Sequence, residues 1–319
     1  RSLVVPQECA GDFMPNKRVH TIEPGDANTI IEDQLSEHLR ALEQELRSAV
    51  LVYIGGIIRP ADDLIRDALD SRTDNRNSRI SVILETDGGY IEVAHRIADA
   101  LRHHFRYVVF IIPNSAMSAG TVLVMSGDAI YMDYYSILGP IDPQVERANS
   151  EMLIPALGYL VQYERLMRKS QQGQLTTAEM AFLIQKFDPA ELYRYEQERE
   201  LSVSLLKEWL VKYKFKNWKI TATRRRKVTH HMREHRAEEI ARKLNDTEHW
   251  HSHSRGISIE VLRRDLKLQI EDFGRLPPLN DKIKTYYNLL KDYMMRRGHE
   301  AALHYGGKYR GMLSCLHVH

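Results

Sequence analysis

Two apolar strands, each followed at once by a turn of small residues, constrain the fold of this chain more than any other feature. The first strand covers residues 80–84 and runs into Asp87-Gly88-Gly89; the second covers residues 107–112 and leads into a turn around Ser118. Between them, residues 91–101 repeat apolar side chains at spacings of three and four, which predicts an amphipathic helix. Strand, helix and strand in this order form a βαβ unit. The fold class is therefore α/β, with a parallel sheet.

Both turns lie where the reactive groups of an open α/β sheet collect, at the carboxyl ends of the strands. Ser118 would begin a helix, and its neighbours Ala119 and Gly120 leave room around the hydroxyl. Gly88 and Gly89 allow a ligand to approach the backbone closely. A serine hydroxyl that faces backbone amides suits acyl transfer. The alternative is structural, since serine is also a favoured helix N-cap.

Three segments then carry a family resemblance: residues 50–56 as a first strand, Asp87-Gly88-Gly89 as oxyanion glycines, and residues 115–120 as a nucleophile elbow. Their order resembles that of the Clp-fold (ClpP/crotonase) serine peptidases, in particular the SDH-type (serine dehydrogenase proteinase) branch related to signal peptide peptidase A. The resemblance implies a ClpP/crotonase-like βαβ spiral core. It also implies Ser118 as the nucleophile, and Gly88, Gly89 and Ala119 as oxyanion or substrate-binding residues.

The chain divides into three predicted segments. Residues 1–48 form an N-terminal arm and helix, residues 49–274 a Clp-fold peptidase domain, and residues 275–319 a C-terminal helical tail. A long helical insertion occupies about residues 150–236. Within it, one helix is expected to carry a stripe along one side, made of Leu192, Tyr195, Arg199, Val203, Leu206 and Leu210. The helical segments at residues 30–47 and 152–214 present more apolar surface than one sheet covers, so we expect a homo-oligomer.

Three residues are candidates for the general base. Clp peptidases place a histidine soon after the elbow, but none occurs between Ser118 and Ile220. Relatives of signal peptide peptidase A use a Ser-Lys dyad instead, which makes Lys169 and Lys186 candidates if burial lowers their pKa toward neutrality. His253, just before the expected closing helix, is the third candidate and the preferred one, because a neutral imidazole needs no tuning.

Composition predicts neither a cofactor nor a membrane partner. The formal net charge is only +2, and 43% of residues are hydrophobic, as in ordinary soluble domains. No apolar run is long enough to span a bilayer, and no signal-peptide core begins the chain. The two cysteines lie near the ends, which favours a reducing, cytoplasmic location. The histidines at 249, 251 and 253 would face one metal only on a strand, so no metal is expected.

A basic stretch keeps a second function class open. Residues 212–236 hold ten lysines and arginines against one acid, Glu234, with aromatic residues among them. Such a patch could bind nucleic acid, although no recognised binding module surrounds it. The leading hypothesis is a cytoplasmic serine peptidase that cleaves peptides or unfolded protein through a Ser118 acyl-enzyme. The alternatives are a non-proteolytic Clp-fold scaffold or nucleic-acid-binding oligomer, and a crotonase-type acyl-CoA enzyme.

Overall fold

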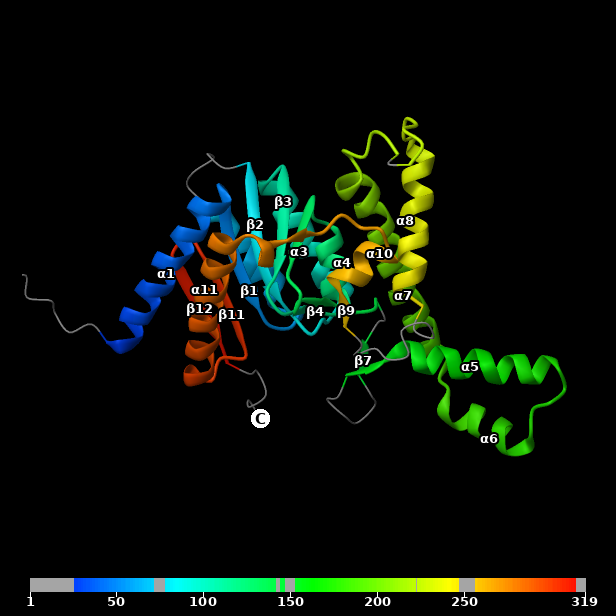
Figure 1. The fold of residues 1–319 in the computed structure, drawn as a ribbon. Coiled ribbons are helices and arrows are strands. Elements are labelled where there is room, and N and C mark those ends of the chain that lie inside the picture. The colour runs from blue at the N-terminus through cyan, green and yellow to red at the C-terminus, as the bar shows by residue number, and fades with distance from the viewer. Residues whose placement is uncertain are drawn as a thin grey trace, which may run out of the picture.

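A seven-stranded sheet runs through the part of the chain that the computed structural model describes, which is residues 26–71, 78–141, 144–146, 153–221, 223–246 and 256–313. Its strands are β1 (Ala49–Ile54), β2 (Arg79–Glu85), β3 (Tyr107–Ile112), β5 (Ala129–Met132), β10 (Glu271–Asp272), β11 (Ala301–Tyr305) and β12 (Lys308–Met312). Their order is β10-β5-β3-β2-β1-β11-β12 (Figure 1). The pairs from β10 to β1 are parallel, and β11 pairs antiparallel with both β1 and β12.

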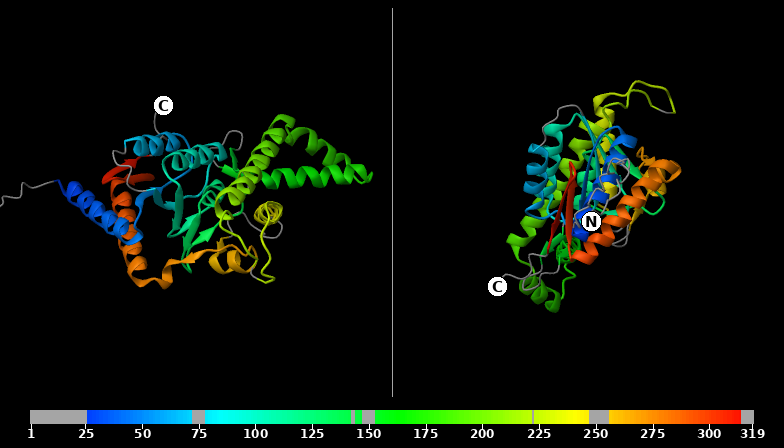
Figure 2. Two further views of the ribbon diagram at one scale, coloured as in Figure 1. Left: turned by 90° about the horizontal axis from the view of Figure 1, so that it is seen from above. Right: turned by 90° about the vertical axis from the view of Figure 1, so that its left-hand side faces the viewer.

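Helices cover both faces of this sheet. On one face lie α2 (Ala61–Asp70), α3 (Ile91–His104) and α4 (Ala119–Met125); on the other lie α1 (Ala27–Leu46) and α11 (Pro277–Arg297) (Figure 2). Successive residues of a strand point to opposite faces, so Leu51 and Tyr53 of β1 join the first core while Val50 and Val52 join the second. Burial on both faces explains why these strands read as continuous apolar runs. The predicted α/β class is confirmed.

A small second sheet fixes the turn around Ser118. It consists of β4 (Ser115–Ala116), β6 (Ile137–Leu138) and β9 (Ile257–Ser258), in the order β4-β6-β9. The backbone of Thr86, at the end of β2, donates to Ser115 O (3.0 Å) and accepts from Met117 N–H (3.0 Å). The serine turn is thereby held against the carboxyl end of the neighbouring strand.

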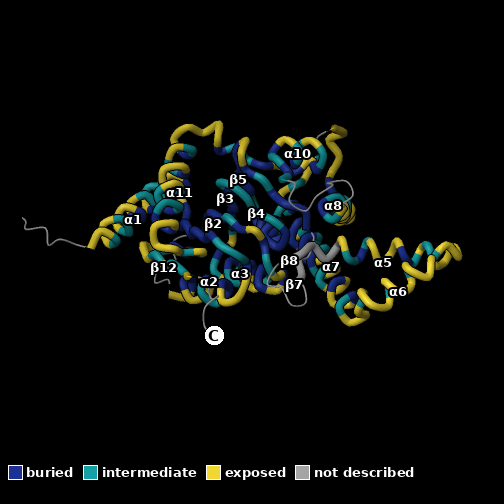
Figure 3. The backbone as a smooth tube through the Cα atoms, turned by 90° about the horizontal axis from the view of Figure 1, so that it is seen from below, coloured by how far each residue is buried: buried dark blue, intermediate teal, exposed yellow. Residues whose placement is uncertain are grey.

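The helical insertion begins with a short hairpin that the sequence did not predict, β7 (Gln144–Glu146) and β8 (Leu153–Pro155). Its helices are α5 (Ala156–Gln171), α6 (Thr177–Lys186), α7 (Pro189–Trp209), a π-helical turn (Leu210–Lys214) and α8 (His230–Leu244), and α10 (Ile259–Arg264) follows before the sheet closes. Two breaks divide these helices: Gly173 has a φ of 68°, and Asp188 caps α7 by accepting from Ala190 N–H at 2.7 Å. Helices α5 and α6 project away from the sheet (Figure 1) and are largely exposed (Figure 3).

The end of the chain holds more than the expected helical tail. After α11, the Gly306-Gly307 turn, with φ values of 57° and 72°, connects β11 to β12. Two consecutive residues with positive φ are typical of a tight hairpin turn. Strand β11 then joins the main sheet beside β1, and α11 packs on α1. The first and last described segments therefore share one core with the sheet. No helix in the described ranges is both long and apolar enough to cross a membrane.

Candidate active site

Ser118 adopts a backbone conformation that L-residues rarely take. Its φ is 50° and its ψ −119°, and only 3% of the residue is exposed. It stands at the N-cap position of α4, but its side chain makes no capping hydrogen bond. The structural alternative, a serine that caps the helix, therefore does not account for this residue. A strained non-glycine backbone persists only where the surrounding structure enforces it, and such residues gather at functional sites.

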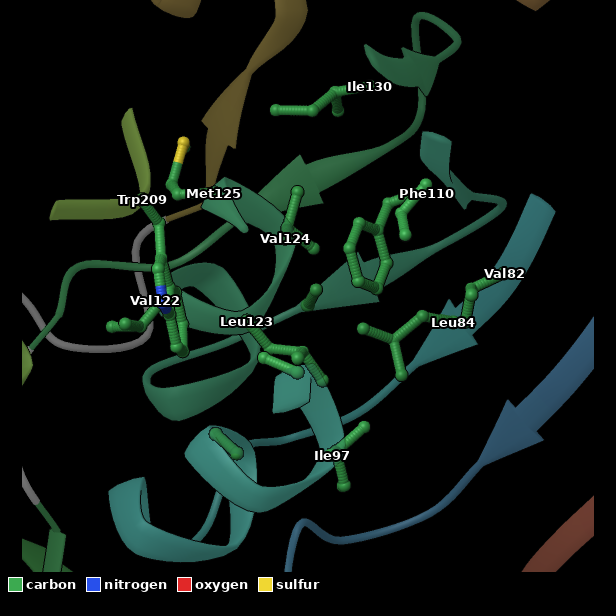
Figure 4. Close-up of a cluster of buried hydrophobic side chains, with 14 of the residues drawn as sticks. Val82, Leu84, Ile97, Phe110, Val122, Leu123, Val124, Met125, Ile130 and Trp209 are labelled. Carbon is green, nitrogen blue, oxygen red and sulfur yellow. The ribbon is translucent and has the colours of Figure 1, made fainter. Parts of the chain in front are cut away.

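Hydrogen bonds of Thr121 and packed apolar side chains hold the serine turn in place. The Thr121 hydroxyl lies 2.8 Å from the carbonyl oxygens of both Ala116 and Gly139 and accepts from Gly139 N–H at 3.0 Å. Beneath it, Val122 and Leu123 of α4 pack into the same buried cluster as Trp209 of α7 (Figure 4). The turn is thus held both by hydrogen bonds and by apolar packing.

Gly88 and Gly89 must both be glycine. Their φ values are 104° and 144°, and an added Cβ would lie 2.8 Å from Ser118 Cβ at position 88 or 2.3 Å from Ile57 O at position 89. Ile57 N–H donates to Gly88 O (2.8 Å) and Tyr90 N–H donates to Ile57 O (2.9 Å). In such a parallel bridge the amide of the middle residue points the other way. The Gly89 N–H is therefore directed away from Ile57.

A narrow cavity brings the serine and the glycine turn together. Its volume is about 10 Å³, which is room for about one water molecule. It is lined by Gly89, Ile91, Ser118, Ala119, Val122, Ile141, Glu198 and Ser202. The Ala119 amide belongs to the first turn of α4, where backbone donors have no partner within the helix. Ser118, Gly89 and Ala119 thus line one cavity, and Gly88 lies directly against Ser118.

Glu198 is the cavity residue that the sequence analysis missed. The expected stripe on this helix placed Arg199 and Val203 inward, whereas the structure buries Ser202 and turns Glu198 toward the cavity. The capping residue Asp188 fixes where α7 begins but not which face packs inward. A usable signal was the run Tyr195, Glu198, Ser202, which continues to Leu205 and Trp209 at spacings of three and four.

Burial raises the pKa of the Glu198 carboxyl above its ordinary value, and nearby Glu92 acts in the same direction. Arg194 opposes them, with its Nε 3.9 Å from Glu198 Oε1. The side chain is 21% exposed, so it lies at the edge of the cavity rather than in open solvent. Carboxylates perturbed by desolvation inside a cleft are candidates for proton transfer.

The three bases proposed from the sequence do not line this cavity among the residues described. Lys169 lies at the far end of α5 and donates to Glu179 Oε1 on α6 at 2.6 Å, which holds the pKa of Glu179 at about 2. Lys186 ends α6, and its carbonyl accepts from Tyr159 Oη at 2.8 Å. His253 lies outside the described residues. All three assignments stay predictions.

About half of the basic stretch serves the protein's own packing. Lys214 is half-buried, and desolvation lowers its pKa to about 8. Lys216 pairs with the buried Asp128, Arg236 pairs with Glu239, and Arg233 donates to Trp218 O at 3.1 Å. Lys212 is exposed in the π-helical turn and pairs with Glu208. The other five cations are exposed in one loop: Lys219, Arg224, Arg225, Arg226 and Lys227.

Metal-binding geometry is absent from the residues that are described: no three histidine, cysteine, aspartate or glutamate side chains there are grouped to hold an ion. The histidines at 249, 251 and 253 and both cysteines fall outside those residues.

Comparison with known proteins finds a family match over part of the chain. Residues 57–176 match the family of ClpP-like SDH-type serine proteinases. The chain is 35% identical over 106 residues to the uncharacterized protein MJ0137 of Methanocaldococcus jannaschii, which covers 33% of this chain and 36% of that protein. It is 35% identical over 77 residues to the uncharacterized protein MJ1495 of the same organism, covering 24% and 26%. The chain thus spans about a third or less of these relatives' length.

Among solved structures, a mutant of the 1510-N membrane-bound stomatin-specific protease aligns with 46% of this chain and 76% of its own. The sequence identity is 18% and the TM-score 0.30. The resemblance predicted from the elbow and the glycine turn is confirmed over the region that the family covers.

Proposed function

We propose that this chain, whose residues 57–176 match the ClpP-like SDH-type serine proteinases, is a serine endopeptidase that cleaves peptides or unfolded protein. The observation that carries the proposal is Ser118 itself, held at φ 50° beside a glycine turn and lining one cavity with Gly89 and Ala119. No other described serine combines this backbone with these neighbours.

The geometry supports acyl transfer in the following way. Ser118 Oγ attacks the scissile carbonyl carbon, and the carbonyl oxygen takes up the displaced electron pair. The amides of Gly89 and Ala119 would donate to this oxyanion, a type of contact that mutagenesis of other enzymes values at about 3 kcal/mol per donor. The amine leaves, and water then hydrolyses the acyl-enzyme. A peptide paired along the outward backbone edge at Gly89 would present its carbonyl to this site as an added strand.

Ser118→Ala tests the proposal. The variant should lose peptide hydrolysis by several orders of magnitude, because the nucleophile is removed, and should keep its far-ultraviolet circular dichroism and Tm. A serine-directed fluorophosphonate should label the wild type at Ser118 and leave the variant unlabelled. Hydrolysis by a pure, folded Ser118→Ala protein would refute the assignment.

A homo-oligomer is part of the proposal. Helix α6 buries none of its residues, and its Met180, Phe182 and Ile184 are 49%, 50% and 73% exposed. Apolar side chains gathered on a projecting helix suit an interface between copies. A cytoplasmic site of action is also proposed; recovery of the protein with washed membranes on cell fractionation would contradict it.

Nucleic-acid binding is the second candidate, and the exposed basic loop favours it. Five cations lie within residues 219–227 without an acid among them. If the loop binds nucleic acid, the affinity should weaken steeply as the salt concentration rises. It should be lost in a variant in which Arg224, Arg225 and Arg226 are replaced by serine. The acyl-CoA alternative would retain the oxyanion turn without needing Ser118, so fluorophosphonate labelling separates both alternatives from a peptidase.

A further inference from the structure

We propose that Glu198 of α7 is the general base that accepts the proton of Ser118; this rests on the proposed peptidase function. Glu198 and Ser118 line the same cavity of about 10 Å³, the size of a single water molecule. A cavity of this size holds one water, and a carboxylate can act as a general base through one water. Glu198 lies outside residues 57–176, the span matched by the family.

The position of Glu198 in α7 is the first support. The inward face of this helix runs through Tyr195, Ser202, Leu205 and Trp209, all of which are buried. Glu198 falls between Tyr195 and Ser202 in the same register of three and four residues. Placing a carboxylate on a packed face costs free energy unless it is hydrogen bonded or paired. Packing alone would favour an apolar side chain here.

The charges around Glu198 are the second support. The groups that act on it are Arg194, one turn earlier on α7, and Glu92 on α3. Helix α4 contributes no ionisable side chain, α5 meets α7 through apolar residues, and α8 meets it through the pair of Lys207 with Glu238. Arg194 is half-exposed and its Nε lies 3.9 Å from Glu198 Oε1, so it opposes the effect of burial without cancelling it, and the pKa of Glu198 is raised. A raised pKa makes the carboxylate a stronger base.

Glu198 alone can account for every proton transfer in the reaction. As Ser118 Oγ forms its bond to the carbonyl carbon, the hydroxyl proton passes to the Glu198 carboxylate. When the tetrahedral intermediate collapses, the C–N bond breaks and the leaving amine takes that proton from the carboxylic acid. In the second half, Glu198 accepts a proton from the attacking water and returns it to Ser118 Oγ.

The test uses Glu198→Gln, which keeps the size of the side chain and removes its basicity. Fluorophosphonate labelling of Ser118 and peptide hydrolysis should both fall by a factor of about 10² to 10⁴, the usual contribution of a general base. Glu196→Gln, on an exposed position of the same helix, is the matched control and should behave as the wild type. Glu198→Asp should recover part of the rate, and unchanged Tm values would show that the variants fold.

The pH profile separates a base from a merely structural residue. In the wild type, kcat/KM should be lost on the acid side through one ionisation above the ordinary glutamate pKa, because only the carboxylate accepts a proton. This limb should disappear in Glu198→Gln. Labelling at the wild-type rate in Glu198→Gln, together with a loss in Lys169→Ala, Lys186→Ala or His253→Ala, would overturn the inference and leave the peptidase standing. Failure of the wild type to label would instead refute the peptidase.

Discussion

Gly89 and Ser118 both hold backbone angles that ordinary residues avoid, yet for different reasons. At Gly89 a side chain would collide with the backbone oxygen of Ile57, at 2.3 Å from the Cβ position. At Ser118 the side chain is retained despite the strained angle, and the residue lines the cavity. The sequence indicated both positions, because glycine pairs and small-residue serine turns at strand ends have recognisable patterns. Glu198 was missed because a spacing of three and four residues shows which positions share a helix face but not which face packs inward.

Gly89→Ala should damage stability and activity together. The added methyl group meets a backbone oxygen that cannot move freely, and φ 144° is strained for alanine; such strain costs about 1–3 kcal/mol. Urea unfolding should show a loss of at least about 2 kcal/mol, and fluorophosphonate labelling should fall sharply. Gly56→Ala is the control, since its Cβ would meet only the Ile58 side chain at 3.6 Å. Equal stability of the two variants would contradict the steric argument.

At the scale of whole elements, the strands and most helices followed from apolar patterning. Strands β1, β2 and β3 are buried on both faces, so each reads as a continuous apolar run in the sequence. Gly173 and Asp188-Pro189 divide the insertion into separate helices. The β11–β12 hairpin was missed. Its partner β1 lies about 250 residues earlier, and such long-range pairing leaves only a weak local signal, here the Gly306-Gly307 turn.

Strand β11 also buries a histidine between the helices of its layer. His304 is fully buried; its Nδ1 lies 2.8 Å from Tyr286 Oη of α11 and its Nε2 3.4 Å from Ser36 Oγ of α1. Burial lowers the pKa of His304 to about 4. Below about pH 6.5 His304 is protonated in the unfolded chain but stays neutral in the folded protein. The free energy of unfolding therefore falls as the pH drops from about 6.5 to about 4.

His304→Asn should remove this share of the acid sensitivity. The full effect is on the order of 3 kcal/mol, from 1.36 kcal/mol per pKa unit. Urea unfolding at pH 7 and pH 5 should therefore show a larger loss on acidification in the wild type than in the variant. Other groups titrate equally in both proteins and cancel in the comparison. Identical pH slopes would mean that His304 becomes protonated without cost in the folded state.

For the whole molecule, the α5–α6 arm sets the expectation of an oligomer. Phe182→Asp should dissociate the assembly seen by light scattering, because a charge would enter the apolar surface of α6. Met295→Asp, on α11 and 75% exposed, is the matched control and should leave the assembly intact. A wild type that scatters as a monomer at micromolar concentration would refute the oligomer, and loss of assembly in both variants would point to a different interface.

The β11–β12 hairpin forms one edge of the sheet, and the charges on that edge affect whether copies of the chain can aggregate. Strand β12 is the last in the sheet order, and its outer backbone edge could recruit a strand from another molecule. Lys308 and Arg310 stand exposed on it. Two such edges brought together would place like charges side by side, and this repulsion discourages fibre-like stacking. Copies of this chain should therefore meet through helices rather than by extending the sheet.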